Sequence, residues 1–172
     1  MQKLINKMSL TFDAISQNEA LARVVISAFV AQLDPVVSDM EDIKTAVSEA
    51  VTNSIVHGYE GEVGTVHMTA NLYDDGVEII VEDYGKGISD IQTALKPMYS
   101  SKASDDRAGL GFTVMEAFMD KLEVVSTINV GTTVCMLKRI EKNEETAPPE
   151  KKEINNFEGF NNLIEDYFEN GE

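Results

Sequence analysis

Apolar and polar residues alternate along five stretches of the chain, as they do in strands that bury one face. The stretches are 8–14, 63–73, 77–83, 122–127 and 132–140. Asp74, Asp75 and Gly76 separate the second stretch from the third, and this composition is typical of a hairpin turn. The pattern therefore predicts five strands, two of them joined directly.

Three other stretches repeat their apolar residues at helical spacing, which predicts helices over 18–33, 38–57 and 110–120. Asn18 is the expected N-cap of the first helix, and Ser38 followed by Glu41 has the pattern of a capping box. The element order is β-α-α-β-β-loop-α-β-β. It predicts an α+β fold, a two-layer sandwich with a mixed, mostly antiparallel sheet and helices on one face.

At 172 residues, the chain is long enough for one domain with a hydrophobic core and a tail. We expect the domain to span residues 1–140. Residues 141–172 read as an acidic linker with Pro148 and Pro149, followed by an amphipathic tail. The tail's apolar stripe fits docking on the domain or on a partner, and its charge fits a solvated acidic segment.

A net charge of −16 and a pI near 4.4 repel phosphate backbones, which argues against direct nucleic-acid binding. Any control of transcription would then act through a protein partner. The only cysteine, Cys135, lies in an apolar run and reads as a buried core residue in a reducing compartment. The sequence has no run of about 18 apolar residues and no signal-peptide pattern, so we expect a cytoplasmic protein without a membrane segment.

Two groups of residues suggest a ligand site. Glu49 and Asn53 are four residues apart and share one face of a predicted helix. Asp83 follows a predicted strand and precedes Gly85 and Gly87, so its carboxylate could accept the amino group of an adenine while the glycines let the backbone approach the base. Each pattern alone is common in proteins without such a site.

Two further patterns lie later in the chain. Arg107, Gly109 and Gly111 lead from a long irregular segment, 85–107, into a predicted helix, where free amide groups and the helix dipole favour phosphate. Thr132 begins the last predicted strand, from which its hydroxyl could reach a ring nitrogen of adenine. A segment as long as 85–107 is usually functional or disordered.

Taken in order, these patterns resemble the ATP-binding fold shared by gyrase, the Hsp90 chaperones, histidine kinases and MutL, over about residues 8–140. Within that superfamily the chain resembles the anti-sigma F factors, serine kinases of sporulating bacteria. The stretches that carry this resemblance are 16–19, 22–23, 31–35, 47–53, 57–59, 109–113 and 118–120.

The resemblance implies a homodimer that binds a sigma factor. It also implies a serine/threonine-protein kinase that uses ATP and Mg²⁺ to phosphorylate an anti-anti-sigma protein, and so a role in regulating transcription during sporulation. The arginine that matches Arg23 lies on the surface that both partners use.

The resemblance also assigns roles to the site residues. It makes Glu49 the general base for the substrate serine and Asn53 the ligand of Mg²⁺. It makes Asp83 the residue that selects adenine, with Thr132 supporting the base. Arg107 would contact the γ-phosphate, and Lys102 would be a further nucleotide contact from the lid. The glycines that would shape the lid are Gly85, Gly87, Gly109 and Gly111.

Two other functions remain open from the sequence. A histidine-kinase-type ATPase would need a phosphoacceptor histidine on a dimerising helical hairpin, and neither His57 nor His67 has that setting. A nucleotide-gated module that binds a sigma factor without turnover would have no need of a base at Glu49.

Overall fold

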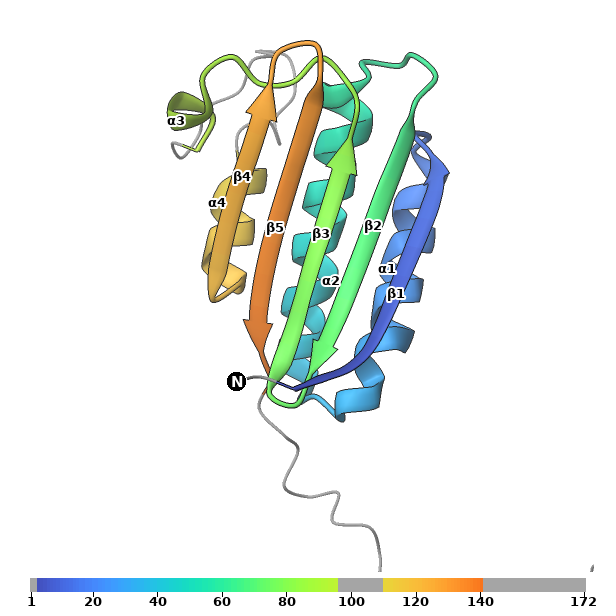
Figure 1. Ribbon diagram of the computed structural model, residues 1–172, viewed down its shortest axis with the longest axis vertical. Coiled ribbons are helices and arrows are strands. Elements are labelled where there is room, and N and C mark those ends of the chain that lie inside the picture. Colours follow the sequence, from blue (N-terminus) through green and yellow to red (C-terminus); the bar gives the residue numbers. More distant parts are fainter. Residues whose placement is uncertain (1–2, 96–109, 141–172) are drawn as a thin grey trace, which may run out of the picture. The chain divides into compact units, whose positions relative to one another are not determined.

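The computed structural model describes residues 3–95 and 110–140. Its strands are β1 (Leu4–Asp13), β2 (Thr65–Tyr73), β3 (Gly76–Asp83), β4 (Lys121–Thr127) and β5 (Gly131–Arg139). They form one sheet in the order β1-β2-β3-β5-β4, and every neighbouring pair is antiparallel (Figure 1). The α+β sandwich is confirmed. The expected mixed sheet is antiparallel throughout these described strands.

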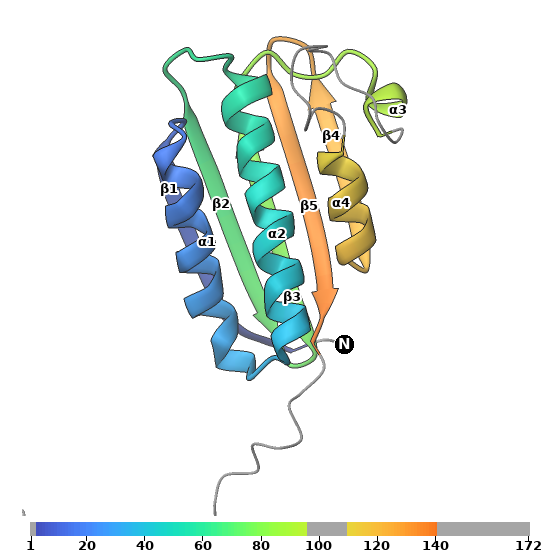
Figure 2. The same cartoon turned by 180° about the vertical axis from the view of Figure 1, so that it is seen from behind.

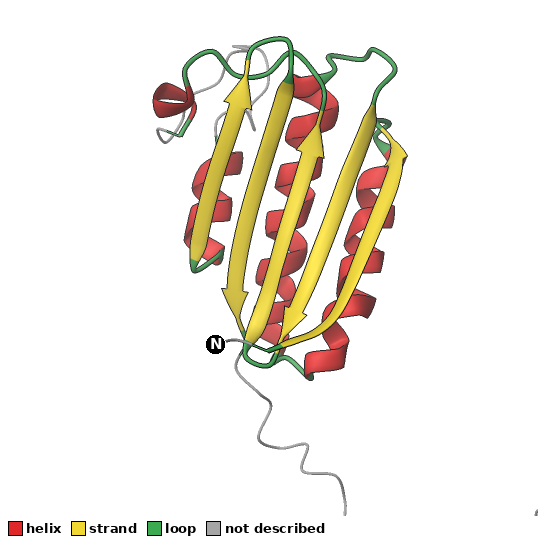
Figure 3. Cartoon of the chain, in the orientation of Figure 1, coloured by secondary structure: helices red, strands yellow, loops and turns green. Residues whose placement is uncertain are grey.

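The described helices lie on one face of the sheet, apart from the short α3 (Figures 2 and 3). They are α1 (Gln17–Val30), α2 (Val37–Asn53), α3 (Ile91–Ala94) and α4 (Gly111–Phe118), with a 3₁₀ turn η1 (Ala31–Leu33) and a π turn η2 (Ser54–Gly58). α2 runs along the middle of the face between α1 and α4, while α3 lies in the connection after β3. The arrangement places α2 over the centre of the sheet.

The core follows directly from the two periodicities in the sequence. β2 alternates strictly between buried and half-buried residues, and its buried side chains meet the inner faces of α1 and α2. The fully buried side chains between the helices and the sheet include Ile26, Val30, Ile43, Val47, Val66, Met68, Leu72, Val77 and Ile79. Burying a side chain of this kind contributes about 1.5–3 kcal/mol, so this interface holds the two layers together.

Both expected helix caps are wrong. α1 begins at Gln17 after Ser16, and the Asn18 side chain instead donates to the Asp13 carbonyl at 2.8 Å. α2 begins after Val36, so Ser38 lies inside its first turn and the capping box does not form. Both helices therefore begin earlier along the chain than the capping side chains alone predict.

The end of α2 also differs from expectation. The predicted helix to residue 57 is an α-helix only to Asn53, and η2 continues it as a wider turn. The Tyr59 N–H donates to the Ser54 carbonyl at 3.1 Å, the i to i+5 bond that defines such a turn. Turns of this kind are frequent at functional sites.

Cys135 is not a core residue. It is half-buried in β5, between the core residues Val134 and Met136, and its Sγ lies 3.9 Å from Glu78 Oε1. Burial raises the pKa of its thiol, and the nearby carboxylate of Glu78 acts in the same direction.

No helix in 3–95 or 110–140 has both the length and the apolar character needed to span a bilayer.

Candidate functional site

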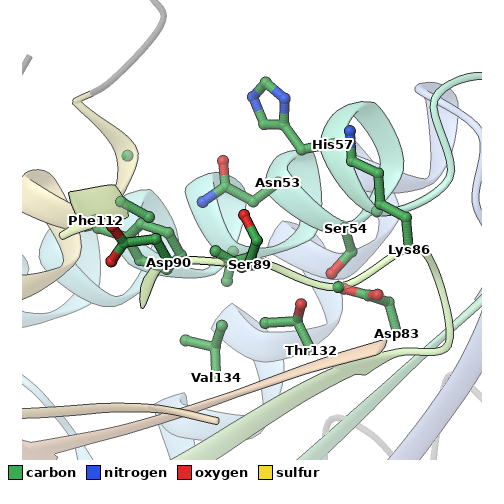
Figure 4. A pocket seen from close by; sticks show the side chains of 16 residues that line it. Asn53, Ser54, His57, Asp83, Lys86, Ser89, Asp90, Phe112, Thr132 and Val134 are labelled. Carbon is green, nitrogen blue, oxygen red and sulfur yellow. The ribbon is translucent and has the colours of Figure 1, made fainter. Parts of the chain in front are cut away.

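A pocket of about 220 Å³ opens where α2 and η2 meet the end of β3, the start of β5 and the start of α4 (Figure 4). Its volume is a little below the roughly 300–1,000 Å³ of typical ligand pockets. The polar side chains lining it come from both layers, and those used below are Asn53, Ser54, Asp83, Lys86 and Thr132. Four of the segments singled out in the sequence therefore meet at one place.

Asp83 ends β3 and is 5% exposed. Its Oδ1 accepts from the Gly85 N–H at 3.0 Å, and its carboxylate also accepts from the Ser54 hydroxyl and the Thr132 backbone N–H. Burial raises the pKa of Asp83 above the ordinary range, and these three bonds oppose that rise. A carboxylate offers about four acceptor directions, so the three donors supplied by described residues leave one for a ligand.

The hydroxyl of Thr132 is held by a residue that the sequence did not single out. Ser126 Oγ in β4 lies 2.9 Å from Thr132 Oγ1 and 3.0 Å from the Gly131 carbonyl oxygen, and it accepts from the Ile88 N–H at 2.8 Å. It thereby ties the start of β5 to the segment after β3. We call Ser54, Asp83, Ser126 and Thr132 the sheet end of the site.

Glu49 and Asn53 lie opposite, on α2, and both are half-buried. A Cβ built on Gly111, the first residue of α4, would lie 3.0 Å from Glu49 Oε2 and 3.2 Å from Asn53 Nδ2. The two side chains expected from their helical spacing to act together therefore do converge, and they do so against the start of α4. We call Glu49, Asn53 and Gly111 the helix end of the site.

The loop after β3 borders the pocket. Gly85 approaches the backbone of Gly58 closely, and the Lys86 N–H donates to the Gly58 carbonyl at 2.9 Å. Gly87 has φ +70°, a left-handed conformation that favours glycine. Of the described residues lining the pocket, Lys86 is the one lysine or arginine, and its Nζ lies 2.5 Å from Glu60 Oε1. No sequence pattern had assigned a role to Lys86.

Arg23 lies away from the pocket, on α1. Its side chain is 47% exposed, and its Nη1 lies 3.5 Å from Glu19 Oε1, one helical turn earlier. Glu19 also accepts a hydrogen bond from the Ser48 hydroxyl of α2. Three other predicted site residues, Lys102, Arg107 and Gly109, fall outside the described residues.

Comparison with known proteins gives the class of this domain. The family model described as histidine kinase-like ATPase domain matches residues 12–138. Among solved structures, a Mycobacterium tuberculosis chain with RsbU and RsbW domains has a TM-score of 0.60 at 23% identity. The match covers 81% of this chain and 34% of that longer one, and it shows a shared fold.

Relatives of known name are much closer in sequence. The anti-sigma F factor of Shouchella clausii is 51% identical over 138 residues, which cover 80% of this chain and 94% of that protein. The anti-sigma F factor of Clostridium perfringens is 54% identical over 136 residues, which cover 78% and 97%. The chain therefore belongs to the anti-sigma F factor family.

Proposed function

We propose that this protein is an anti-sigma factor and an ATP-dependent serine kinase, which binds a sporulation sigma factor and phosphorylates an anti-anti-sigma protein. The observation that carries the proposal is the convergence of Glu49 and Asn53 on Gly111, with Asn53 and Gly111 lining the same pocket as the buried Asp83. In this arrangement Asp83 would select the base, and the oxygen-bearing side chains of Glu49 and Asn53 would lie toward the phosphates. Membership of the anti-sigma F factor family supplies the partner class.

The sheet end would bind adenine. In its ionised form Asp83 is an acceptor, so it favours the exocyclic amino group of adenine and disfavours the carbonyl oxygen of guanine at the same position. The Thr132 hydroxyl, held by Ser126, would reach a ring nitrogen through a bridging water. An unpaired buried polar group costs roughly 1–3 kcal/mol, which is enough for a clear preference for ATP over GTP.

The helix end would hold Mg²⁺ and the phosphates. Mg²⁺ prefers oxygen ligands and is commonly held by one or two protein groups together with substrate phosphates. The amide of Asn53 fits that donor set, and no three His, Cys, Asp or Glu side chains in the described ranges form a separate metal cluster. Arg107, Lys102, Gly109 and Gly111 would contact or enclose the phosphates, with Gly85 and Gly87 shaping the near edge.

Glu49 would act as the general base. Its carboxylate would accept the proton of the substrate serine as the serine oxygen attacks the γ-phosphorus and the bond to the leaving ADP oxygen breaks. Bound Mg²⁺ neutralises charge on the phosphates during this transfer. A glutamate is a weak base for a hydroxyl, so positioning of the serine and charge neutralisation must supply most of the rate.

The partner surface would include Arg23. Its exposed side chain lies on α1, apart from the pocket, so a partner could contact it without displacing the nucleotide. We further propose a cytoplasmic homodimer, in which the domain of residues 1–140 carries these activities and the acidic tail of 141–172 has a separate role.

The test mixes the full chain with Mg-ATP and a candidate anti-anti-sigma protein, followed by mass spectrometry for phosphoserine. We expect one phosphoserine on the partner, formed far more slowly with Glu49→Gln. ATP binding without any phosphoserine would leave a nucleotide-gated sigma-factor binder, and phosphohistidine would point to a histidine-kinase-type ATPase. In a parallel pull-down, Arg23→Glu should lose sigma-factor binding while calorimetry shows unchanged ATP affinity.

A further inference from the structure

Ser54 occupies an unusual position in the site. It follows Asn53 directly, begins the π turn η2, and is 4% exposed. Its hydroxyl donates to the carboxylate of Asp83, which lies 29 positions further along the chain (Figure 4). Ser54 therefore links the end of α2, which carries Asn53, to Asp83, the residue expected to recognise the base.

We infer that Ser54 is a specificity-determining residue of the nucleotide site: its hydroxyl bond holds the Asp83 carboxylate as an oriented acceptor for the amino group of adenine. This inference rests on the proposed function, because it concerns how the same pocket distinguishes ATP from other nucleotides. Nothing in the spacing of the predicted motifs identified Ser54.

Three donors from the described residues reach the Asp83 carboxylate. The Gly85 and Thr132 N–H groups are fixed by the backbone, whereas Ser54 supplies the only side-chain donor among the described contacts of this carboxylate. Burial favours the neutral acid, and each donor favours the ionised form. A neutral Asp83 would carry its own O–H and could donate to the carbonyl of guanine, so loss of a donor weakens discrimination as well as affinity.

The geometry explains why a small hydroxyl residue serves at this position. Gly58, the last residue of η2, lies so near that a Cβ built on it would be 3.0 Å from Asp83 Oδ1. The turn thus packs directly against the carboxylate, and Ser54 provides its hydrogen bond. The i to i+5 bond from the Tyr59 N–H to the Ser54 carbonyl fixes the turn in that shape.

The experiment measures dissociation constants of the full chain and of Ser54→Ala by calorimetry. The ligands are Mg-ATP, Mg-GTP and the Mg complex of purine riboside triphosphate, which lacks the exocyclic amino group. We expect Ser54→Ala to weaken ATP binding about tenfold, in line with the loss of one bond to a charged group. Binding of purine riboside triphosphate should change less than about twofold, and the ATP to GTP preference should narrow.

Ser48→Ala is the matched control. It removes another serine-to-carboxylate bond from α2, the one to Glu19, at a residue outside the pocket lining. All three affinities should be unchanged in that variant. Ser54→Cys, which keeps nearly the same volume with a weaker donor, should repeat the selective loss of ATP affinity if Ser54→Ala does not fold.

The outcomes separate this inference from the proposed function. Failure of the unmodified protein to bind ATP would overturn the proposed function itself. Tight ATP binding by the unmodified protein with no loss in Ser54→Ala would overturn only the role of Ser54. An equal loss for ATP and purine riboside triphosphate would assign Ser54 a structural role and overturn the inference in the same way.

Discussion

The two ends of the site are built from different parts of the chain. At the sheet end, Asp83 and Thr132 stand on paired strands and are 5% and 9% exposed, and backbone N–H groups fix the carboxylate. At the helix end, Glu49 and Asn53 are half-buried side chains that meet Gly111. In the proposed function, recognition of the base would rest on a buried carboxylate held largely by backbone groups, while the chemistry would rest on half-buried side chains.

Only the sheet end carries a free-energy cost for burying a charged group. Burial raises the pKa of Asp83, so the sheet end holds a charge that the fold itself disfavours, and it offsets this with three hydrogen bonds. The helix end places its carboxylate on the surface of α2, where solvent still reaches it. Substitutions at the sheet end should therefore affect folding and recognition together, whereas those at the helix end should affect catalysis or binding alone.

The largest expected effect is at the helix end, in Glu49→Gln. The amide keeps the size of the side chain and cannot accept the serine proton, so phosphotransfer should fall by about 10²- to 10⁴-fold. The dissociation constant for Mg-ATP should stay within about twofold. Phosphoserine formation and calorimetry measure the two quantities, and Glu41→Gln, an exposed change on the same helix, is the control. Full activity in Glu49→Gln would remove the general-base assignment.

Gly131→Ala tests whether the sheet end is part of the fold. Gly131 has φ +134°, and a Cβ there would lie 1.9 Å from the carbonyl oxygen of Asp83. Backbone conformations of this kind cost roughly 1–3 kcal/mol in other residues, and the overlap adds to that cost. Urea denaturation should show a loss of at least this size in the unfolding free energy. An unchanged midpoint would mean that the turn can rearrange and that the sheet end is less rigid than its contacts imply.

Gly111→Ala is the counterpart at the helix end. Its Cβ would meet the tips of the Glu49 and Asn53 side chains, which can shift, whereas the Gly131 Cβ would meet backbone. The unfolding free energy should stay within about 0.5 kcal/mol, the range of ordinary surface changes. Mg-ATP affinity should fall several-fold because Asn53 is displaced. Equal loss of stability in both glycine variants would erase the distinction between the two ends.

The sequence predicted much of the fold, and it singled out residues at both ends of the pocket. Periodicity identified the five strands and three main helices, and i, i+4 spacing identified Glu49 and Asn53, because both signals are local. Ser126 and Lys86 were missed, since their roles depend on contacts made only after folding. Cys135 was misjudged for a related reason: alternation identifies two faces of a strand but does not say how completely each one is covered.

Asp83→Asn addresses the smallest expected effect, the pH dependence of stability. The pKa of Asp83 is raised in the folded state, so the folded protein holds this proton at pH values where the unfolded chain has released it. The contribution of Asp83 to the unfolding free energy is therefore fully present below about pH 4, the ordinary carboxyl value, and is lost as the pH rises through the raised pKa. Asn at this position does not titrate, so its own contribution is constant.

The measurement is the difference in unfolding free energy between the natural chain and Asp83→Asn, taken by urea denaturation from pH 4 to pH 8. The difference should fall with rising pH, by less than about 1.4 kcal/mol per pH unit. His57, Lys86 and Asp90 line the same pocket and are present in both proteins, so their contributions cancel in the difference to first order. A difference that rises with pH would mean that the hydrogen bonds to Asp83 outweigh its burial.

Repeating the comparison in a Ser54→Ala background should extend the falling region to higher pH, because one of the three donors that oppose burial is gone. That extension would show that the Ser54 hydroxyl, which is inferred to set nucleotide specificity, also offsets the free-energy cost of burying the Asp83 carboxylate.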